Sequence, residues 1–82
     1  MELKVLPKYY NDLKNGKKTF EIRKNDRDFR TGDILVLSEY DPVTKERTAA
    51  KHLYFKVTYI LEDARYLQEG YVCMGLIVYK AN

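Results

Sequence analysis

The sequence has little of what disulfide-linked and metal-binding proteins need. Its 82 residues include one cysteine, Cys73, and one histidine, His52. A single cysteine excludes an intrachain disulfide and a cysteine-based zinc site, and a single histidine cannot form a histidine metal cluster. We therefore expect no metal site, a buried and unreactive thiol at Cys73, and a surface position for His52.

Long apolar segments are also absent. No apolar run approaches the roughly 18 residues that cross a membrane, and nothing resembles a signal peptide. There is no internal repeat, low-complexity tract or obvious linker. These absences predict one globular domain over residues 1–82, placed in a reducing cytoplasm and without a membrane partner. So short a chain cannot enclose a large cofactor, so we expect no cofactor and a shallow groove as the kind of site.

The positive charge is concentrated in one segment. The net charge of the chain is +3, but residues 14–30 hold seven bases and three acids. That segment alone carries +4, which leaves −1 for the other 65 residues. Such local asymmetry indicates an anionic partner more strongly than the total charge does.

Hydrophobic periodicity predicts about five strands and one helix. The helix starts at Pro7 and ends before Gly16, a residue suited to a left-handed stop. The expected strands are Glu2 to Leu6, Thr19 to Lys24, Ile34 to Tyr40, Leu53 to Glu62 and Tyr71 to Lys80. Long antiparallel strands in a small chain curl to remove exposed edges. We therefore predict an α+β, mainly β fold: a pseudo-β-barrel with the N-terminal helix flanking a cleft.

Most aromatic residues are assigned to structure. Phe29 is expected to pin its loop to the barrel, and Gly75, inside the last strand, indicates a bend or a close backbone approach. Four tyrosines are expected to pack in the barrel or on the helix face: Tyr9, Tyr10, Tyr59 and Tyr71.

The stretch GKKTFEIRKND, residues 16–26, carries the candidate site. Glu21 and Arg23 are two positions apart on the predicted strand and project from the same face. Lys18 lies at or before the start of the strand, so its side chain can turn toward that face. Arginine grips a phosphate or a base edge, lysine adds a point charge, and glutamate accepts from an exocyclic amine or a ribose hydroxyl. The predicted contact to nucleic acid extends over Lys24, Asn25 and Arg27. The plainer alternative is an ion pair on a solvated face.

Four residues of this stretch carry a resemblance to a known family. Gly16, Lys18, Glu21 and Arg23 spell G-x-K-x-x-E-x-R, which resembles the signature of the ASCH domains, small members of the PUA-like superfamily. The continuation FEIRKNDRDFRTGDILVLSEYD is similar to a compact subgroup of bacterial and phage proteins in that superfamily. The resemblance implies a pseudo-barrel whose cleft, between barrel and helix, is lined by the motif residues and binds RNA or a modified nucleotide.

The same resemblance bears on catalysis. Some ASCH proteins are amidohydrolases that remove an acyl group from N4-acetylcytidine with the motif lysine, a threonine at the position of Glu21 and a distant glutamate. Here Lys18 is kept, but Glu21 replaces the threonine, so the nucleophile is missing. The sequence therefore favours an RNA- or nucleotide-binding module over an enzyme. The alternatives are a hydrolase of a modified nucleoside, with Lys18 as base and Glu21 orienting water, and a non-catalytic protein-interaction or accessory factor.

Overall fold

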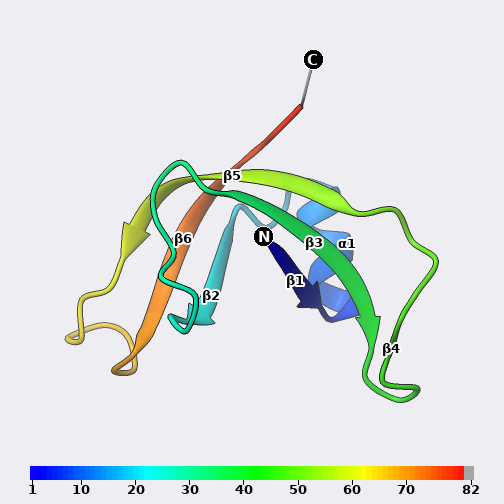
Figure 1. Cartoon of the computed structure of the whole chain (residues 1–82), viewed down its shortest axis with the longest axis horizontal. Coiled ribbons are helices and arrows are strands. Elements are labelled where there is room, and N and C mark those ends of the chain that lie inside the picture. The colour runs from blue at the N-terminus through cyan, green and yellow to red at the C-terminus, as the bar shows by residue number, and fades with distance from the viewer. Residues whose placement is uncertain (81–82) are drawn as a thin grey trace.

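A curled sheet with one short helix beside it makes up the structure, a computed structural model that describes residues 1–80 (Figure 1). The elements in chain order are β1 (Glu2–Val5), α1 (Pro7–Lys14), β2 (Phe20–Lys24), β3 (Ile34–Asp41), β4 (Glu46–Arg47), β5 (Leu53–Leu61) and β6 (Tyr71–Val78). The predicted α+β, mainly β class is confirmed. The last two residues of the predicted domain lie outside the described residues.

The strand order places β1 and β2 at the two edges of the sheet. The order is β1–β3–β5–β6–β2, with β4 paired to β3 alone. β1 runs parallel to β3, and the other pairs are antiparallel. Figure 1 shows the sheet arching as a half-barrel, with β1 and β2 brought back beneath the arch and α1 beside β1 and β3. β1 and β2 are therefore the free edges of the sheet, and they lie on either side of an open seam.

β4 was missed by the sequence prediction, which placed no strand between Tyr40 and Leu53. The hairpin between β3 and β4 closes through a bond from Lys45 N to Asp41 O at 2.8 Å, with Lys45 at a φ of 61°. Glycine or asparagine usually signals such a left-handed turn position, whereas lysine does not. The left-handed residue that leads the chain into β4 therefore had no recognisable signal in the sequence.

The core lies inside the arch and is sealed on one side by α1. Its buried residues are Leu3, Val5, Tyr10, Leu13, Phe29, Leu35, Leu37, Phe55, Val57, Val72, Met74 and Leu76. The helix docks through Tyr10 and Leu13, and the Tyr10 hydroxyl donates to Lys51 O at 2.6 Å. Burial raises the pKa of the Tyr10 phenol. The buried Phe29 confirms its predicted role as the anchor of its loop.

Gly16 is needed for its backbone conformation, as predicted, and Gly75 lies where there is little room for a side chain. Gly16 ends the helical segment at a φ of +77°. Gly75 faces the irregularity in β5 between Val57 and Tyr59, where a Cβ would lie 3.1 Å from Thr58 Oγ1. A close approach at Gly75 was expected from another backbone, but the nearest atom belongs to the Thr58 side chain.

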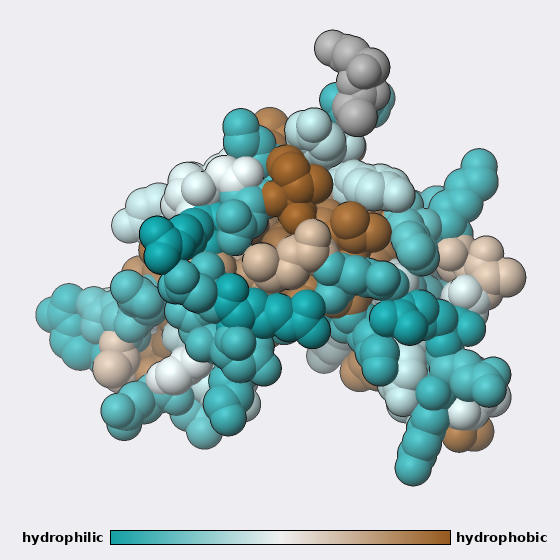
Figure 2. All heavy atoms as spheres, viewed as in Figure 1, coloured by the Kyte–Doolittle hydropathy of each residue, from teal (hydrophilic) through white to brown (hydrophobic). Residues whose placement is uncertain are grey.

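β2 buries a charged side chain and exposes the apolar side chains beside it. The alternation along β2 is confirmed, but Glu21 is only 3% exposed, whereas Phe20 and Ile22 are 43% and 49% exposed. Cys73 pairs with Ile22 on the outward face and is half-buried, so the prediction of a buried thiol was wrong. Figure 2 shows mostly hydrophilic side chains on the viewed face, with hydrophobic atoms exposed near β3 and β5. β2 therefore turns Glu21 and Arg23 inward and Phe20 and Ile22 outward, with Lys24 on the same exposed face as Ile22.

Among residues 1–80, no helix combines the length and the apolar character that crossing a bilayer requires.

Candidate functional site

The turn after α1 positions the lysine of the motif. Lys17 N and Lys18 N both donate to Asp12 O, at 2.9 and 3.0 Å, so the chain reverses tightly before it enters β2. Lys18 precedes the first residue of β2 by two positions. Its side chain is therefore free of the alternation of the strand and turns to the inner face, beside Glu21.

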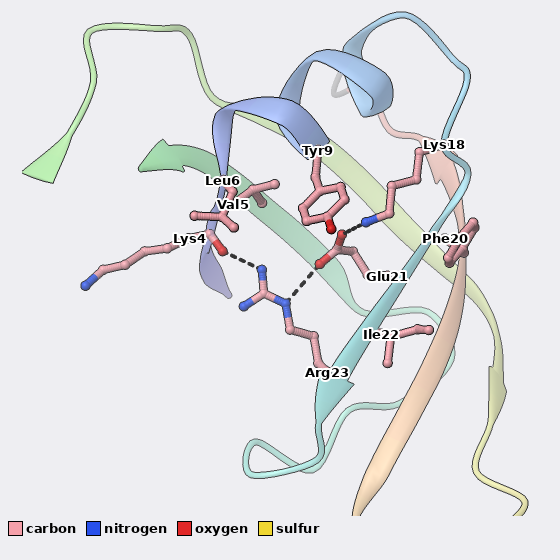
Figure 3. A pocket seen from close by; sticks show the side chains of 9 residues that line it. All are labelled: Lys4, Val5, Leu6, Tyr9, Lys18, Phe20, Glu21, Ile22 and Arg23. Atoms are coloured by element: carbon pink, nitrogen blue, oxygen red, sulfur yellow. Dashed lines mark hydrogen bonds and ion pairs between the residues drawn. The ribbon is translucent and has the colours of Figure 1, made fainter. Parts of the chain in front are cut away.

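The inner face of β2 holds a carboxylate between two cations. Glu21 Oε1 accepts a hydrogen bond from Lys18 Nζ, and Glu21 Oε2 accepts one from Arg23 Nε at 2.9 Å (Figure 3). The Glu21 side chain is 5% exposed, against 16% for Lys18 and 26% for Arg23. Each carboxylate oxygen thus has a charged partner, and the two cations lie nearer the solvent than the acid. We call these three residues the triad.

Two arginines join the free edge of β1 to β2 and its following loop. Arg23 Nη2 donates to Lys4 O at 2.5 Å, and Arg27 Nη1 donates to Glu2 O at 3.0 Å. Carbonyls on a free strand edge need a partner when no further strand is present. The arginine side chains provide it, so the triad is tied directly to β1 across the seam.

A pocket opens at the seam over the triad. It has a volume of about 450 Å³ and is lined by Lys4, Val5, Leu6, Tyr9, Lys18, Phe20, Glu21, Ile22 and Arg23. Its walls come from β1, the start of α1 and β2, together with Leu6 just before the helix and Lys18 in the turn before β2. The pocket therefore lies between the helix and the curled sheet, and Figure 3 shows the hydrogen-bonded carboxylate of Glu21 inside it.

Two aromatic rings flank the lysine of the triad. Lys18 Nζ lies 4.8 Å from the centroid of the Tyr9 ring and 5.4 Å from that of Phe20. Both residues are more than two-fifths exposed, so a planar ligand can reach them. The sequence analysis assigned Tyr9 to packing and did not select Phe20. The exposure of Tyr9 could have been inferred from its neighbour. Tyr10 lies on the core-facing side of the helix, and adjacent helical residues point in different directions, so Tyr9 lies on another side.

The remaining predicted contact residues lie further along the chain. Lys24 and Arg27 line a second pocket, of about 300 Å³, together with Leu3, Ile22, Arg23, Asp26, Phe29 and Tyr71. Ile22 and Arg23 belong to both pockets. Asn25 is in the lining of neither pocket, because its side chain turns to the loop and Oδ1 accepts from Phe29 N at 3.0 Å.

The position of Asn25 leads to a test of its role. Asn25→Ala is expected to lower the free energy of unfolding by about 1 kcal/mol, because the Phe29 amide loses its acceptor. Urea denaturation measures this change. Asn25→Asp keeps an acceptor oxygen and serves as the matched control. An unchanged midpoint for Asn25→Ala would show that the loop does not depend on this bond.

Comparison with known proteins gives a family and a phage relative. Residues 1–76 match the model of a family described as "Domain of unknown function (DUF3850)". A stretch of 39 residues is 44% identical to an "Uncharacterized 12.9 kDa protein in GpA 3'region" of Escherichia phage P2. This stretch makes up 48% of the present chain and 36% of the phage protein, so the match spans about a third of that relative's length.

Proposed function

This chain belongs to the DUF3850 family, and from the geometry of its pocket we propose that it binds RNA or a nucleotide. The base occupies the pocket at the seam between β1 and β2, in contact with the triad and the two aromatic rings. The finer resemblance of the G-x-K-x-x-E-x-R motif to the ASCH domains supports this proposal, since all three triad residues belong to that motif.

The observation that carries the proposal is that β2 buries Glu21 and exposes the apolar residues on either side of it. Taking a carboxylate and its partners out of water costs several kcal/mol, and well-packed apolar side chains in their place are often as stable or more so. The neighbouring positions hold Phe20 and Ile22, which stay exposed while Glu21 is buried. A buried polar group beside exposed apolar ones is the informative departure from ordinary packing. Ligand recognition explains it better than stability does.

The chemistry of the pocket fits a nucleobase with its phosphate. Each oxygen of Glu21 accepts one bond within the triad and retains a further lone pair, suited to an exocyclic amine. Arg23 uses Nε and one N–H of Nη2, so three of its five donors stay free for a phosphate or a base edge. The rings of Tyr9 and Phe20 offer faces for stacking.

The composition of the pocket supports binding over acyl transfer. Its nine lining residues include no serine, threonine or cysteine that could attack an acyl group. Thr19, the nearest threonine to the motif position, contributes to the wall of a different pocket. Incubation with N4-acetylcytidine and related N-modified nucleosides, followed by chromatography, tests the enzyme alternative. Turnover of any of them would favour hydrolysis.

Loss of the triad cations is expected to weaken RNA binding. Lys18→Ala and Arg23→Ala each remove a charge-assisted contact of about 1.5–3 kcal/mol, which corresponds to roughly a tenfold or greater loss of affinity. Fluorescence anisotropy with short labelled single-stranded RNA measures this loss, and the affinity of the unaltered protein should fall steeply with salt because phosphate contacts release counterions.

Lys17→Ala is the matched control, since Lys17 is exposed, adjoins Lys18 and is not in the pocket lining. Circular dichroism shows whether each variant is folded. No detectable binding at low salt to any RNA or nucleotide would refute the proposal. Equal affinity of the unaltered protein and both triad variants would refute it as well.

A further inference from the structure

The two pockets adjoin along one strand. The first contains Glu21 and the second contains Lys24, and Ile22 and Arg23 line both. A strand advances about 3.3 Å per residue, so the Cα atoms of Glu21 and Lys24 are about 10 Å apart. Arg23 lines both pockets and keeps unused donors, so it is placed to bind a phosphate between them. Lys24 and Arg27 are therefore placed for the next part of a longer ligand.

Charge is concentrated along this double pocket. Five cationic side chains and two carboxylates line the two pockets together, a net charge of +3. The whole chain also carries +3, so the rest of the molecule is neutral overall. The residues concerned are Lys4, Lys18, Arg23, Lys24 and Arg27, against Glu21 and Asp26. Such a field along one track matches a chain of phosphates rather than a single one.

The second pocket has donors that the fold does not use. Among the described residues 1–80, Lys24 forms no ion pair, and it is exposed. Arg27 uses only Nη1 for Glu2 O, which leaves its other N–H groups free. Asp26 is the one acid in the lining, and its backbone N–H closes a turn onto Lys24 O at 2.9 Å. The second pocket thus offers lysine and arginine donors but has no buried carboxylate, as Glu21 is in the first, to accept from a base. It therefore suits a phosphate and its sugar more than a base.

We propose that the ligand is a single-stranded oligonucleotide and that a free mononucleotide fills only part of the site. One base binds at the triad, Arg23 holds the phosphate between the pockets, and Lys24 with Arg27 holds the sugar-phosphate of the neighbouring nucleotide. This inference rests on the proposed function and narrows its ligand to a polymer.

The test compares two ligand lengths in two forms of the protein. A labelled single-stranded RNA of roughly eight nucleotides is titrated by anisotropy, and the four nucleoside monophosphates are titrated by calorimetry. The RNA is expected to bind the unaltered protein at least about tenfold more tightly than any monophosphate. Lys24→Ala/Arg27→Ala should weaken RNA binding about tenfold or more, reduce its salt slope by about 0.7 for each lost phosphate contact, and leave monophosphate affinity unchanged.

Two further variants separate binding from folding and from net charge. Lys24→Ala alone spares the bond from Arg27 to β1, so it reports on the ligand even if the double variant unfolds. Lys45→Ala/Arg65→Ala removes the same charge outside both pockets and should leave RNA affinity within about twofold. Equal affinity for RNA and monophosphate, or no loss in either Lys24 variant, would overturn this inference while nucleotide binding stands. Absence of binding by both ligands would instead overturn the proposed function.

Discussion

Glu21→Ala is expected to lower the free energy of unfolding by about 3 kcal/mol. Removing one partner of a buried ion pair costs about 3–5 kcal/mol, because the remaining charges stay partly desolvated without compensation. The low end applies here, since Lys18 and Arg23 retain some contact with solvent. Equilibrium denaturation in guanidinium chloride measures the change. For a chain of this size such a loss is a large part of the total stability.

A triple variant distinguishes ligand binding from stability as the reason for the triad. Lys18→Met/Glu21→Leu/Arg23→Met replaces all three charges by apolar side chains of similar length. Such replacements of buried ion pairs are often neutral or stabilising by about 1–4 kcal/mol. We expect this variant to be about as stable as the unaltered protein and to have lost RNA binding. If it is as unstable as Glu21→Ala, the triad is required by the fold itself.

A more exposed ion pair of the same spacing provides the control. Arg65 pairs with Asp63 two positions away, as Arg23 pairs with Glu21, and the two side chains are 79% and 29% exposed, against 26% and 5% in the triad pair. Asp63→Ala should therefore change stability by no more than about 1 kcal/mol. A Glu21→Ala effect equally small would contradict the burial of the carboxylate.

Phe20→Ala and Tyr9→Ala are expected to lower RNA affinity strongly and stability little. A base stacked on an aromatic side chain contributes about 1–3 kcal/mol, or roughly 5- to 150-fold in affinity. Both residues are more than two-fifths exposed, so truncation of their side chains leaves little buried volume unfilled. Anisotropy with the labelled RNA gives the affinity, and thermal denaturation gives the stability.

Tyr66→Ala is the matched aromatic control, because Tyr66 is 73% exposed on the segment between β5 and β6. It should leave both affinity and stability unchanged. If Phe20→Ala and Tyr9→Ala behave like Tyr66→Ala, the bases do not stack at this pocket. The ligand would then be held by charge alone, and the salt dependence of its binding would be correspondingly steep.

Much of the fold could be predicted from local patterns. The strand periods, Pro7 at the helix start and Gly16 after its end depend on residues close in sequence, and each was found within a few positions of its predicted place. The convergence of Glu21 and Arg23 also followed from their spacing, since residues two apart on a strand share a face. Lys18 was expected to turn toward that face because it precedes the strand, and it does.

Other parts of the site could not be predicted because they depend on distant segments. Periodicity shows that Phe20 and Ile22 share a face, but not that this face is outward. The apolar pattern alone would have placed them in the core and Glu21 in water. Likewise, no local rule brings Arg23 and Arg27 to the carbonyls of β1. Their contact requires the sheet to curl until its two edge strands, β1 and β2, approach each other across the seam.

The amino-acid sequence alone therefore determined which elements form and which charged residues share a strand face, because those properties depend on short-range periodicity and backbone preference. The tertiary structure alone decided that β2 turns its carboxylate inward, that Tyr9 stands over Lys18, and that two pockets adjoin at the seam. The physical reason is that strand pairing and the curvature of the sheet, rather than any local preference, choose which face is buried and which edges approach each other.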